Sequence, residues 1–310
     1  MKINQIRPLE AKFTEVLESI ALKPKMLYFI GKMPENVSKT VGIVGARKCT
    51  SYGEKIAYEA AYELALAGVL VVSGLAYGID SIAARGALDA GGKTVAILGT
   101  PIDRIYPEAH RALAEEIVEK GGAIISEYPP RDQSLLEMEL GPDETMKNGF
   151  RELNCRTSFL YRNRLIAGLS DAVLVAEAAE HSGSLNTASH AIEMGVELFA
   201  PPGDITRKTS AGCNRLISQG AHLYTGPRDI LEMLFPGGLP GEKKIKRMPV
   251  FAGSPIEKMI VQEIFSGNTD GEQIMVKLGL SAAEFSQAIT MLEIRGLVKP
   301  LGMNNWSLKL

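Results

Sequence analysis

The stretch "VGIVGARKCTSYGEKIAYEAAYELALAGVLVVSG", residues 41–74, decides the fold. It opens with a short apolar run at 41–44, continues through helix-forming residues at 52–67, stops at Gly68 and returns to an apolar run at 69–72. A short apolar run, a helix that ends on glycine and a second apolar run are typical of a strand–helix–strand unit. The stretch therefore predicts two parallel strands joined by a helix.

The same alternation continues as far as Phe235. Further strands are expected at 94–98, 123–126, 172–176 and 197–200. Further helices are expected at 80–90, 107–120, 184–194 and 212–219, before a last strand and helix. Short buried strands separated by helices indicate a mostly parallel sheet that is covered on both faces. The expected fold class is α/β, an extended Rossmann-like fold over residues 41–235.

The flanking segments have different compositions. Residues 1–40 are predicted to form a short N-terminal helical lead-in, with a helix at 9–22 and an extended piece at 26–30. Residues 236–250, "PGGLPGEKKIKRMPV", are rich in proline, glycine and lysine, which predicts a basic flexible linker. Residues 251–310 predict three helices, at 255–265, 271–278 and 281–294, followed by a short hairpin. That order predicts a small winged-helix-like α domain.

The third of these helices is the candidate recognition helix. Taken from Ser281 to Arg295, it holds one basic residue, Arg295, beside Glu284 and Glu293. A helix that reads a major groove normally brings several cationic or amide side chains to phosphates and bases. We therefore interpret the domain as a partner or regulatory module rather than a strong duplex binder.

The composition is that of an ordinary globular protein of 310 residues, with 45% hydrophobic residues and a net charge of -2, so an anion-binding surface has to be local. No apolar run approaches the roughly 20 residues of a membrane span, and a signal peptide is not expected. Cys49, Cys155 and Cys213 lie far apart and lack metal-ligand spacing with the histidines. This indicates neither a disulfide framework nor a metal site, and favours a cytoplasmic location.

Glycine-bearing turns follow several predicted strands. In an open parallel sheet, ligands bind beyond the carboxyl ends of the strands. The turns are Gly45-Ala-Arg47-Lys48, the loop from Ser73 and Gly74 to Gly78, Ile79 and Asp80, and Ser182-Gly183-Ser184. Such turns expose backbone N–H groups at the positive end of a helix dipole and can bind anions. Tight turns between strands and helices also require glycine for structural reasons, but several turns on one rim favour a phosphate-rich ligand.

The common enzyme motifs are absent from the sequence. The first turn has no G-x-G-x-x-G pattern, and the second strand ends in Ser73-Gly74 without an acidic residue for a ribose. No Walker motif or G-x-S-x-G elbow occurs either. We expect no cofactor, no metal and no catalytic residue.

Residues 151–164, "RELNCRTSFLYRNR", hold four arginines against one acid, with Phe159 and Tyr161 between them. Cations follow a phosphate backbone while aromatic faces stack bases, a combination that suits single-stranded nucleic acid. Arg162 and Arg164 point about 200° apart on a helix, so the alternative is that one of them pairs within the fold. The acidic stretch 133–146 is either a solvated insertion or a flap over this basic site.

Six blocks resemble, in order, the DNA-processing protein A family (DprA, also called Smf). The blocks are "VGIVGARKCTSYG", "VVSGLAYGIDSIAARGALDAGGKTVAILGT", "DRIYPEAHRALAEEI", "ISEYPP", "FLYRNRLIAGLSDAVLVAEAAEHSGSLNTASHAIEMG" and "PPGDITRKTSAGCNRLISQGA". The resemblance implies a non-catalytic homodimer that binds and protects incoming single-stranded DNA. It also implies a role in loading RecA recombinase during natural transformation.

The resemblance also implies individual roles. It places a phosphate pocket at Arg47, over the 73–80 loop and at Ser182-Gly183-Ser184. It makes Phe159 a base-stacking ring, with Arg156 three residues before it, and matches a motif at Arg162-Asn163-Arg164. Leu216 and Ile217 become candidates for a dimer interface. The chain departs from the family at Leu160, where proline is usual, and at Ala84, where histidine is usual.

Two other functions remain open. One is a nucleotide-binding sensor or a phosphoribohydrolase-like enzyme of the related lysine-decarboxylase-like fold, whose motif is P-G-G-x-G-T-x-x-E. The corresponding loop from Ser182 to Thr187 is followed by no acid before Glu193, so a general acid or base is missing. The other is a structural scaffold that acts through the C-terminal module.

Overall fold

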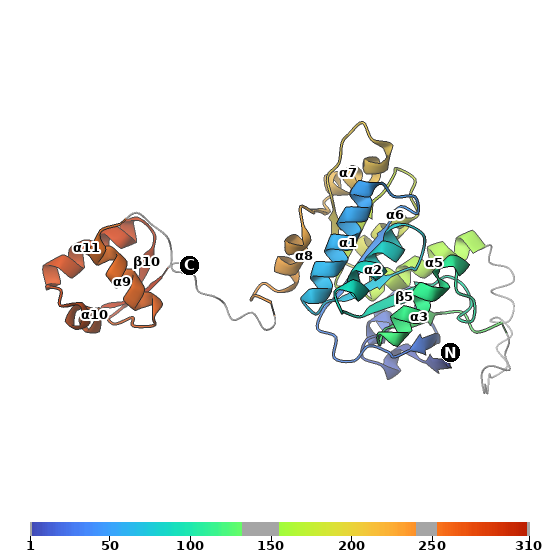
Figure 1. The fold of residues 1–310 in the computed structure, drawn as a ribbon, viewed down its shortest axis with the longest axis horizontal. Helices are drawn as coiled ribbons and strands as arrows, with labels where there is room; N and C mark the ends of the chain where they lie inside the picture. Colours follow the sequence, from blue (N-terminus) through green and yellow to red (C-terminus); the bar gives the residue numbers. More distant parts are fainter. Residues whose placement is uncertain (1, 132–154, 240–252, 309–310) are drawn as a thin grey trace. The chain divides into compact units, whose positions relative to one another are not determined.

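A computed structural model describes residues 2–131, 155–239 and 253–308, and only the backbone of Cys155 and Arg156. The chain divides into two compact units, Met1–Pro240 and Gly241–Leu310 (Figure 1). The predicted acidic stretch 133–146 lies outside the described residues, and so does most of the predicted linker 236–250.

The first unit is built on one sheet with the strand order β1-β2-β6-β5-β4-β3-β7-β8-β9 in the described residues. The strands are β1 (Ile3–Ile6), β2 (Leu27–Gly31), β3 (Thr40–Gly45), β4 (Leu70–Ser73), β5 (Thr94–Leu98), β6 (Ala123–Ser126), β7 (Ala172–Glu177), β8 (Glu197–Ala200) and β9 (His222–Leu223). Neighbours from β6 across to β9 are parallel. The predicted α/β, Rossmann-like fold with a mostly parallel sheet is confirmed.

The strand order reverses between β3 and β7. The chain adds β4, β5 and β6 on one side of β3, then returns to add β7, β8 and β9 on the other side. In open α/β sheets the ligand crevice lies beyond the carboxyl ends of the strands at such a reversal. The topology therefore directs attention to the turns that follow β3, β4, β5 and β7.

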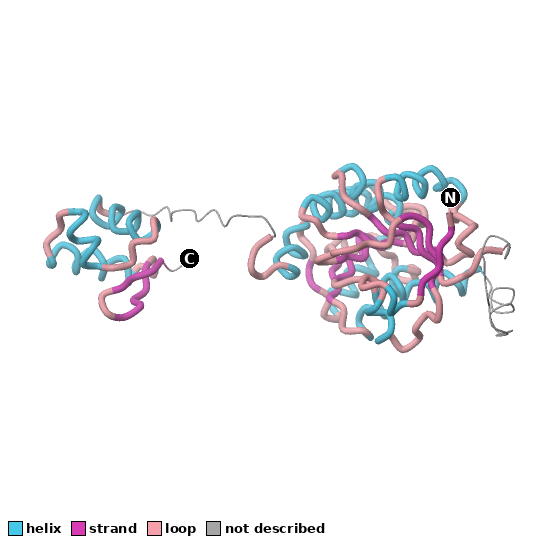
Figure 2. The backbone as a smooth tube through the Cα atoms, turned by 90° about the horizontal axis from the view of Figure 1, so that it is seen from below, coloured by secondary structure: helices cyan, strands magenta, loops and turns pink. Residues whose placement is uncertain are grey.

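Helices cover both faces of the sheet, so that the strands lie between two helical layers (Figure 2). One layer holds α1 (Ser51–Leu66), α2 (Ile79–Asp89), α3 (Arg111–Glu119, after the short 3-10 helix η3, Glu108–His110) and α8 (Pro227–Leu234). The other holds α5 (Cys155–Gly168), α6 (Ser184–Glu193) and α7 (Ala211–Ser218). Alternate side chains of β5 face opposite layers: Val95 and Ile97 pack toward α5, and Ala96 and Leu98 toward α2 and α3.

The first 40 residues differ from the predicted helical lead-in. They contain two short 3-10 helices, η1 (Pro8–Glu10) and η2 (Glu15–Ser19), instead of one helix over 9–22. β2 pairs antiparallel with β6, and β1 pairs with β2, so this segment completes the sheet. Leu17 and Leu27 are fully buried in the core. The Rossmann-like unit thus begins before the predicted boundary at residue 41, because β2 covers an edge that β6 would otherwise expose.

The second unit holds α9 (Pro255–Phe265), α10 (Gly271–Leu278), α11 (Ala282–Ile294) and a hairpin of β10 (Val298–Gly302) and β11 (Asn305–Leu308). Ser281 caps α11 by accepting a hydrogen bond from the Glu284 N–H at 3.3 Å. Ile260, Ile274 and Leu292 form the centre of its core. The predicted order of three helices and a hairpin is present, and the winged-helix class stays a prediction.

Leu27→Ala should lower the free energy of unfolding of the first unit by about 2–5 kcal/mol, because it leaves a cavity at a fully buried position. The matched control is Leu22→Ala, a side chain that is 56% exposed, which should change stability by less than about 0.5 kcal/mol. Urea denaturation of the full chain measures both. Equal stability of the two variants would show that residues 1–40 are not part of the core.

Candidate nucleic-acid interface

Arg162 on α5 joins the carboxyl ends of two neighbouring strands. Its Nη1 donates to the carbonyl oxygen of Gly74, just after β4, at 2.9 Å, and also to the carbonyl of Ile97 on β5. A Cβ at position 74 would lie 2.5 Å from the guanidinium, so only glycine leaves room for this approach. Burial lowers the pKa of Arg162 to about 10, so the group remains charged at neutral pH. The buried Arg162 therefore holds the carboxyl ends of β4 and β5 together.

Asn163 connects the same helix to the turn that precedes α6. Its Nδ2 donates to the carbonyl of Gly183 at 3.3 Å and to Oδ1 of Asn186 at 3.2 Å. Its own Oδ1 accepts from Nε of Arg162 at 3.3 Å. Two consecutive residues of α5 thus hold the end of β5 and the turns after β4 and β7 in one place.

Arg164 is turned toward the N-terminal segment. Its Nε donates to the carbonyl of Leu22 at 2.7 Å, and its Nη2 forms an ion pair with Glu127 at 2.7 Å. Its guanidinium carbon lies 3.8 Å from the centroid of the Tyr161 ring. The residue is only 1% exposed, so its donors are used within the fold.

The burial of Arg162, Asn163 and Arg164 corrects the expectation that this motif lines a DNA surface. All three residues are buried, and their polar atoms bind backbone and side chains of the protein. The alternative was that one of Arg162 and Arg164 pairs within the fold; the geometry shows that both do. Sequence alone did not separate the two, because most of the partners, such as the carbonyls of Gly74 and Leu22 and the Glu127 carboxylate, lie far away in the chain.

The loop from Ser73 to Asp80 is also closed internally. Ser73 donates to the carbonyl of Ile43 at 2.6 Å, and Oδ2 of Asp80 accepts from the N–H of Gly74 at 3.0 Å. Burial raises the pKa of the Asp80 carboxyl, and the charge of Arg162 opposes that shift. Ile79 is buried and its N–H donates to the carbonyl of Ala46 at 3.3 Å. Ser73, Ile79 and Asp80 therefore shape the loop, whereas we had expected them to contact a ligand.

Arg47 and Phe159 are the predicted residues that meet at the surface. Arg47 and Lys48 are exposed in the turn after β3, and the guanidinium carbon of Arg47 lies 5.4 Å from the centroid of the half-buried Phe159 ring. This distance is within the range of a cation–π contact. Phe159 lies against Gly99, where a Cβ would come within 2.6 Å of the ring. A cation and an aromatic face are thus side by side at the carboxyl ends of the strands.

A small hollow surrounds this pair. It is lined by Arg47, Gly74, Ala76, Tyr77, Tyr106, Pro107, Phe159 and Arg162. Its free volume is only about 10 Å³, room for about one water molecule, so a base can lie over it but not enter it. Tyr77 and Tyr106 were not singled out from the sequence. The feature of the sequence that could have identified them is an aromatic residue in a glycine- or proline-bearing turn after a strand.

The Ser182–Ser184 turn forms the start of α6. Gly183 is exposed, whereas Ser184 is buried, and the hydroxyls of Ser182 and Ser184 lie 2.7 Å apart. The Ser184 N–H donates to the Ser182 hydroxyl at 3.4 Å, and the N–H groups of Leu185 and Asn186 donate to the carbonyls of Ser182 and Gly183. The first turn of α6 is thus bonded internally, and it lies at the positive end of the helix dipole. The Asn163 contact ties this turn to the same helix as Phe159.

The other predicted residues have different positions. Gly45 and Gly78 lie in the turns around Arg47: a Cβ on Gly78 would come within 2.7 Å of the Arg47 carbonyl. The backbone of Arg156 lies in the first turn of α5, and its side chain is outside the described residues. Leu216 is 5% exposed and packs into the core, so it corrects the expectation of a dimer contact. Ile217 beside it is half-buried.

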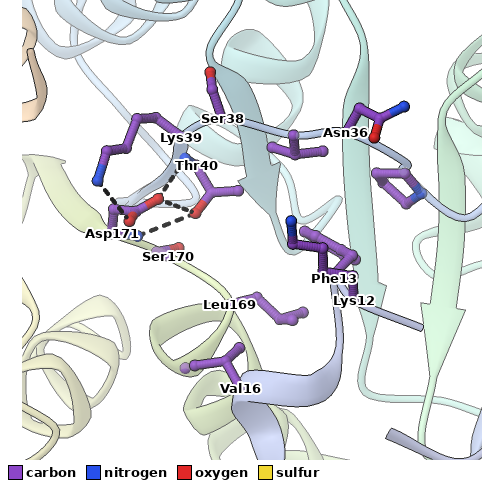
Figure 3. A pocket seen from close by; sticks show the side chains of 13 residues that line it. Lys12, Phe13, Val16, Asn36, Ser38, Lys39, Thr40, Leu169, Ser170 and Asp171 are labelled. Atoms are coloured by element: carbon purple, nitrogen blue, oxygen red, sulfur yellow. Dashed lines mark hydrogen bonds and ion pairs between the residues drawn. The ribbon is translucent and has the colours of Figure 1, made fainter. Parts of the chain in front are cut away.

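A larger cavity of about 230 Å³ lies at the opposite end of β3. Figure 3 shows Lys39, Thr40 and Asp171 linked at one side of it. Oδ2 of Asp171 accepts from the Thr40 N–H at 2.7 Å, and Lys39 pairs with Asp171 at 3.2 Å. Because Thr40 begins β3 and Gly45 ends it, this cavity is at the amino edge of the sheet and is separate from the Arg47–Phe159 surface.

The described residues contain no group of three or more histidine, cysteine or acidic side chains placed to hold a metal ion. Among the same residues, no helix has the length and apolar character needed to cross a bilayer.

Comparisons with known proteins agree on one family. A family model described as DNA recombination-mediator protein A matches residues 4–139 and 148–235. The putative DNA processing protein DprA of Mycobacterium tuberculosis is 35% identical over 280 residues, which cover 89% of this chain and 67% of that protein. DNA processing protein DprA of Streptococcus pneumoniae is 37% identical over 219 residues, 69% of this chain and 68% of that protein.

Two solved structures share the fold. The X-ray structure of DprA from Streptococcus pneumoniae has a TM-score of 0.61 at 34% identity and covers 74% of each chain. A structure of DNA processing protein A from Helicobacter pylori, reported for its single-stranded DNA binding mode, has a TM-score of 0.58 at 28% identity and covers 76% of this chain and 99% of that one. This chain belongs to the DNA recombination-mediator protein A family, the DprA/Smf family that its sequence resembles.

Proposed function

We propose that the chain binds single-stranded DNA along a strand-end rim formed by Arg47, Lys48, Phe159 and the turn 182–184. The observation that carries the proposal is the exposed Arg47 guanidinium 5.4 Å from the Phe159 ring, at the carboxyl ends of the parallel strands. Cations track phosphates while aromatic faces stack bases without regard to sequence. The DNA-binding mode reported for the Helicobacter pylori relative supports the same ligand class.

The geometry favours an unpaired strand over a duplex. The Phe159 ring can stack only on a base whose face is free, and the faces of bases inside a duplex are already stacked. The hollow beside the ring is too small to receive a base that is flipped out of a duplex. The bases of an unpaired strand can lie across Phe159 while its phosphates contact Arg47 and the exposed Gly183 of the 182–184 turn.

We propose binding without catalysis. Glu177, at the end of β7, is 3% exposed. Its carboxylate accepts from the N–H of Thr50 at 2.8 Å and from the Thr50 hydroxyl at 3.0 Å. Asp80 is also buried and bonded to backbone. Both carboxylates are used to position loops, so neither of these two is free for the general acid–base work that the phosphoribohydrolase alternative requires.

The wider role rests on family resemblance. We propose that the chain acts in the cytoplasm as a homodimer that protects incoming single-stranded DNA and helps to load RecA recombinase during natural transformation. The family model, described as a recombination mediator, supports this role.

For the C-terminal unit we propose contact with a protein partner. Arg295, the basic residue at the end of α11, donates to Glu257 of α9 at 3.0 Å and is engaged within the domain. The exposed positions of α11 include Glu284 and Glu293, which would repel phosphates.

Fluorescence anisotropy across a salt series tests the strand-end rim. The chain should bind oligo-dT more tightly than a duplex of equal length, with an affinity that falls as salt rises. Arg47→Ala should weaken binding and reduce the salt slope by about 0.7, the value for one phosphate of a single strand. Phe159→Ala should cost about 1–3 kcal/mol and leave the slope unchanged, since stacking releases few counterions.

The control for this series is Lys93→Ala, which removes an exposed cation before β5, at the amino edge of the sheet. It should leave affinity and slope at the wild-type values. Equal loss of slope in Arg47→Ala and Phe159→Ala would contradict the division between phosphate and base contacts.

Arg164→Ala should lower the free energy of unfolding by about 3–5 kcal/mol, because it leaves the Glu127 carboxylate, which is 12% exposed, without its ion-pair partner. Arg47→Ala should change stability by less than about 0.5 kcal/mol, since Arg47 is exposed. Thermal and urea denaturation measure the difference. A stable Arg164→Ala protein that no longer binds oligo-dT would show that this arginine contacts DNA directly.

Truncation separates the strand-end rim from the scaffold alternative. A chain ending at residue 250 keeps the basic segment 236–250, and a chain ending at residue 235 removes it. Both should bind oligo-dT with the affinity of the full chain, because Arg47 and Phe159 lie in the first unit. Loss of binding in the chain that ends at residue 250 would favour a function carried by the C-terminal unit.

A further inference from the structure

We infer that Tyr77 and Tyr106 form a second base-stacking position beside Phe159, so that the strand-end rim holds neighbouring bases of an unpaired strand. The inference rests on the proposed function and adds two contact residues to it. Both tyrosines line the hollow that also contains Arg47 and Phe159.

Tyr106 extends the aromatic surface directly. Its ring centroid lies 5.1 Å from that of Phe159, with a tilt of 34° between the planes. The residue is 39% exposed. It follows β5 and precedes η3, so it comes from a different segment than α5, which carries Phe159. Two rings from distant parts of the chain therefore form one surface that faces solvent.

The Tyr77 ring is positioned by packing against His110. Its ring packs edge-on against His110, with 5.0 Å between the centroids, and Nδ1 of His110 lies 2.8 Å from the carbonyl oxygen of Leu75. Tyr77 is 48% exposed. A half-exposed ring that is already fixed in position loses little conformational entropy when a base stacks on it, which favours binding.

The hydroxyls of Tyr77 and Tyr106 have no hydrogen-bond partner among the described residues. Tyr52, another half-exposed tyrosine, differs in this respect, because its hydroxyl donates to the carbonyl of Pro202 at 2.6 Å. Within the part of the chain that the structure describes, the two tyrosines of the hollow thus present both an aromatic face and an unpaired phenol, a combination that suits a base beside a phosphate.

The test combines protein variants with an oligo-dT series in which one base at a time is replaced by an abasic site. Tyr77→Ala with Tyr106→Ala should weaken binding of intact oligo-dT roughly 5- to 150-fold, the value of one stacked base. Tyr77→Phe with Tyr106→Phe keeps the rings and should bind nearly as tightly as wild type. Tyr62→Ala removes a half-buried ring of α1 and serves as the control that leaves affinity unchanged.

Abasic scanning distinguishes a direct contact from support of Phe159. Wild type should lose affinity at two neighbouring abasic positions, the double-alanine variant at only one of them, and Phe159→Ala only at the other. Tyr106→Ala should still weaken binding when added to Phe159→Ala, whereas a ring that only supports Phe159 would have no further effect.

The outcomes separate the two proposals. If wild type binds oligo-dT and loses affinity through Phe159→Ala but not through the tyrosine variants, the second position is wrong and the proposed function stands. If the phenylalanine variants bind as weakly as the alanine variants, stacking is not the tyrosines' role and the inference is overturned. If wild type shows no preference for single-stranded DNA, both proposals fail.

Discussion

The hydrogen bonds from the buried Arg162 guanidinium to the strand-end carbonyls of Gly74 and Ile97 are the contacts on which the rest of the surface depends. The Ile97 carbonyl lies near the end of β5, and the Gly74 carbonyl follows the neighbouring strand β4. A buried carbonyl without a partner costs about 1–3 kcal/mol, and one charged group satisfies both. Because Arg162 enters from α5, the same helix is fixed against the strand ends, and Phe159 one turn earlier is fixed with it.

This arrangement separates the groups that build the rim from those that can touch a ligand. The Arg162-Asn163-Arg164 motif is buried, and it ties α5 to the end of β5, to the turns after β4 and β7 and to the N-terminal segment. The exposed groups, Arg47, Lys48 and the rings around Phe159, come from other turns. Their relative positions depend on the buried motif, so its residues affect binding through geometry rather than through contact.

Strand–helix alternation allowed most of the fold to be predicted from local patterns, including the strands at 94–98, 123–126 and 197–200. The extended piece predicted at 26–30 corresponds to β2, but β1 and the antiparallel pairing were missed, because the pairing depends on contacts with β6 about 100 residues away and not on local periodicity. The Arg47–Phe159 pair was anticipated, whereas the burial of Arg164 and the exposure of Tyr77 and Tyr106 were not. These depend on tertiary packing, which a single sequence does not display.

Ultraviolet cross-linking of oligo-dT that carries 5-iodouracil tests the central claim most directly, because it marks the residues that touch bases. Proteolysis and mass spectrometry then locate the linked peptides. The account predicts cross-links in α5 around Phe159 and in the turns after β4 and β5. Cross-links confined to the cavity around Lys12 and Asp171 at the amino edge of the sheet, or to residues 253–308, would contradict it.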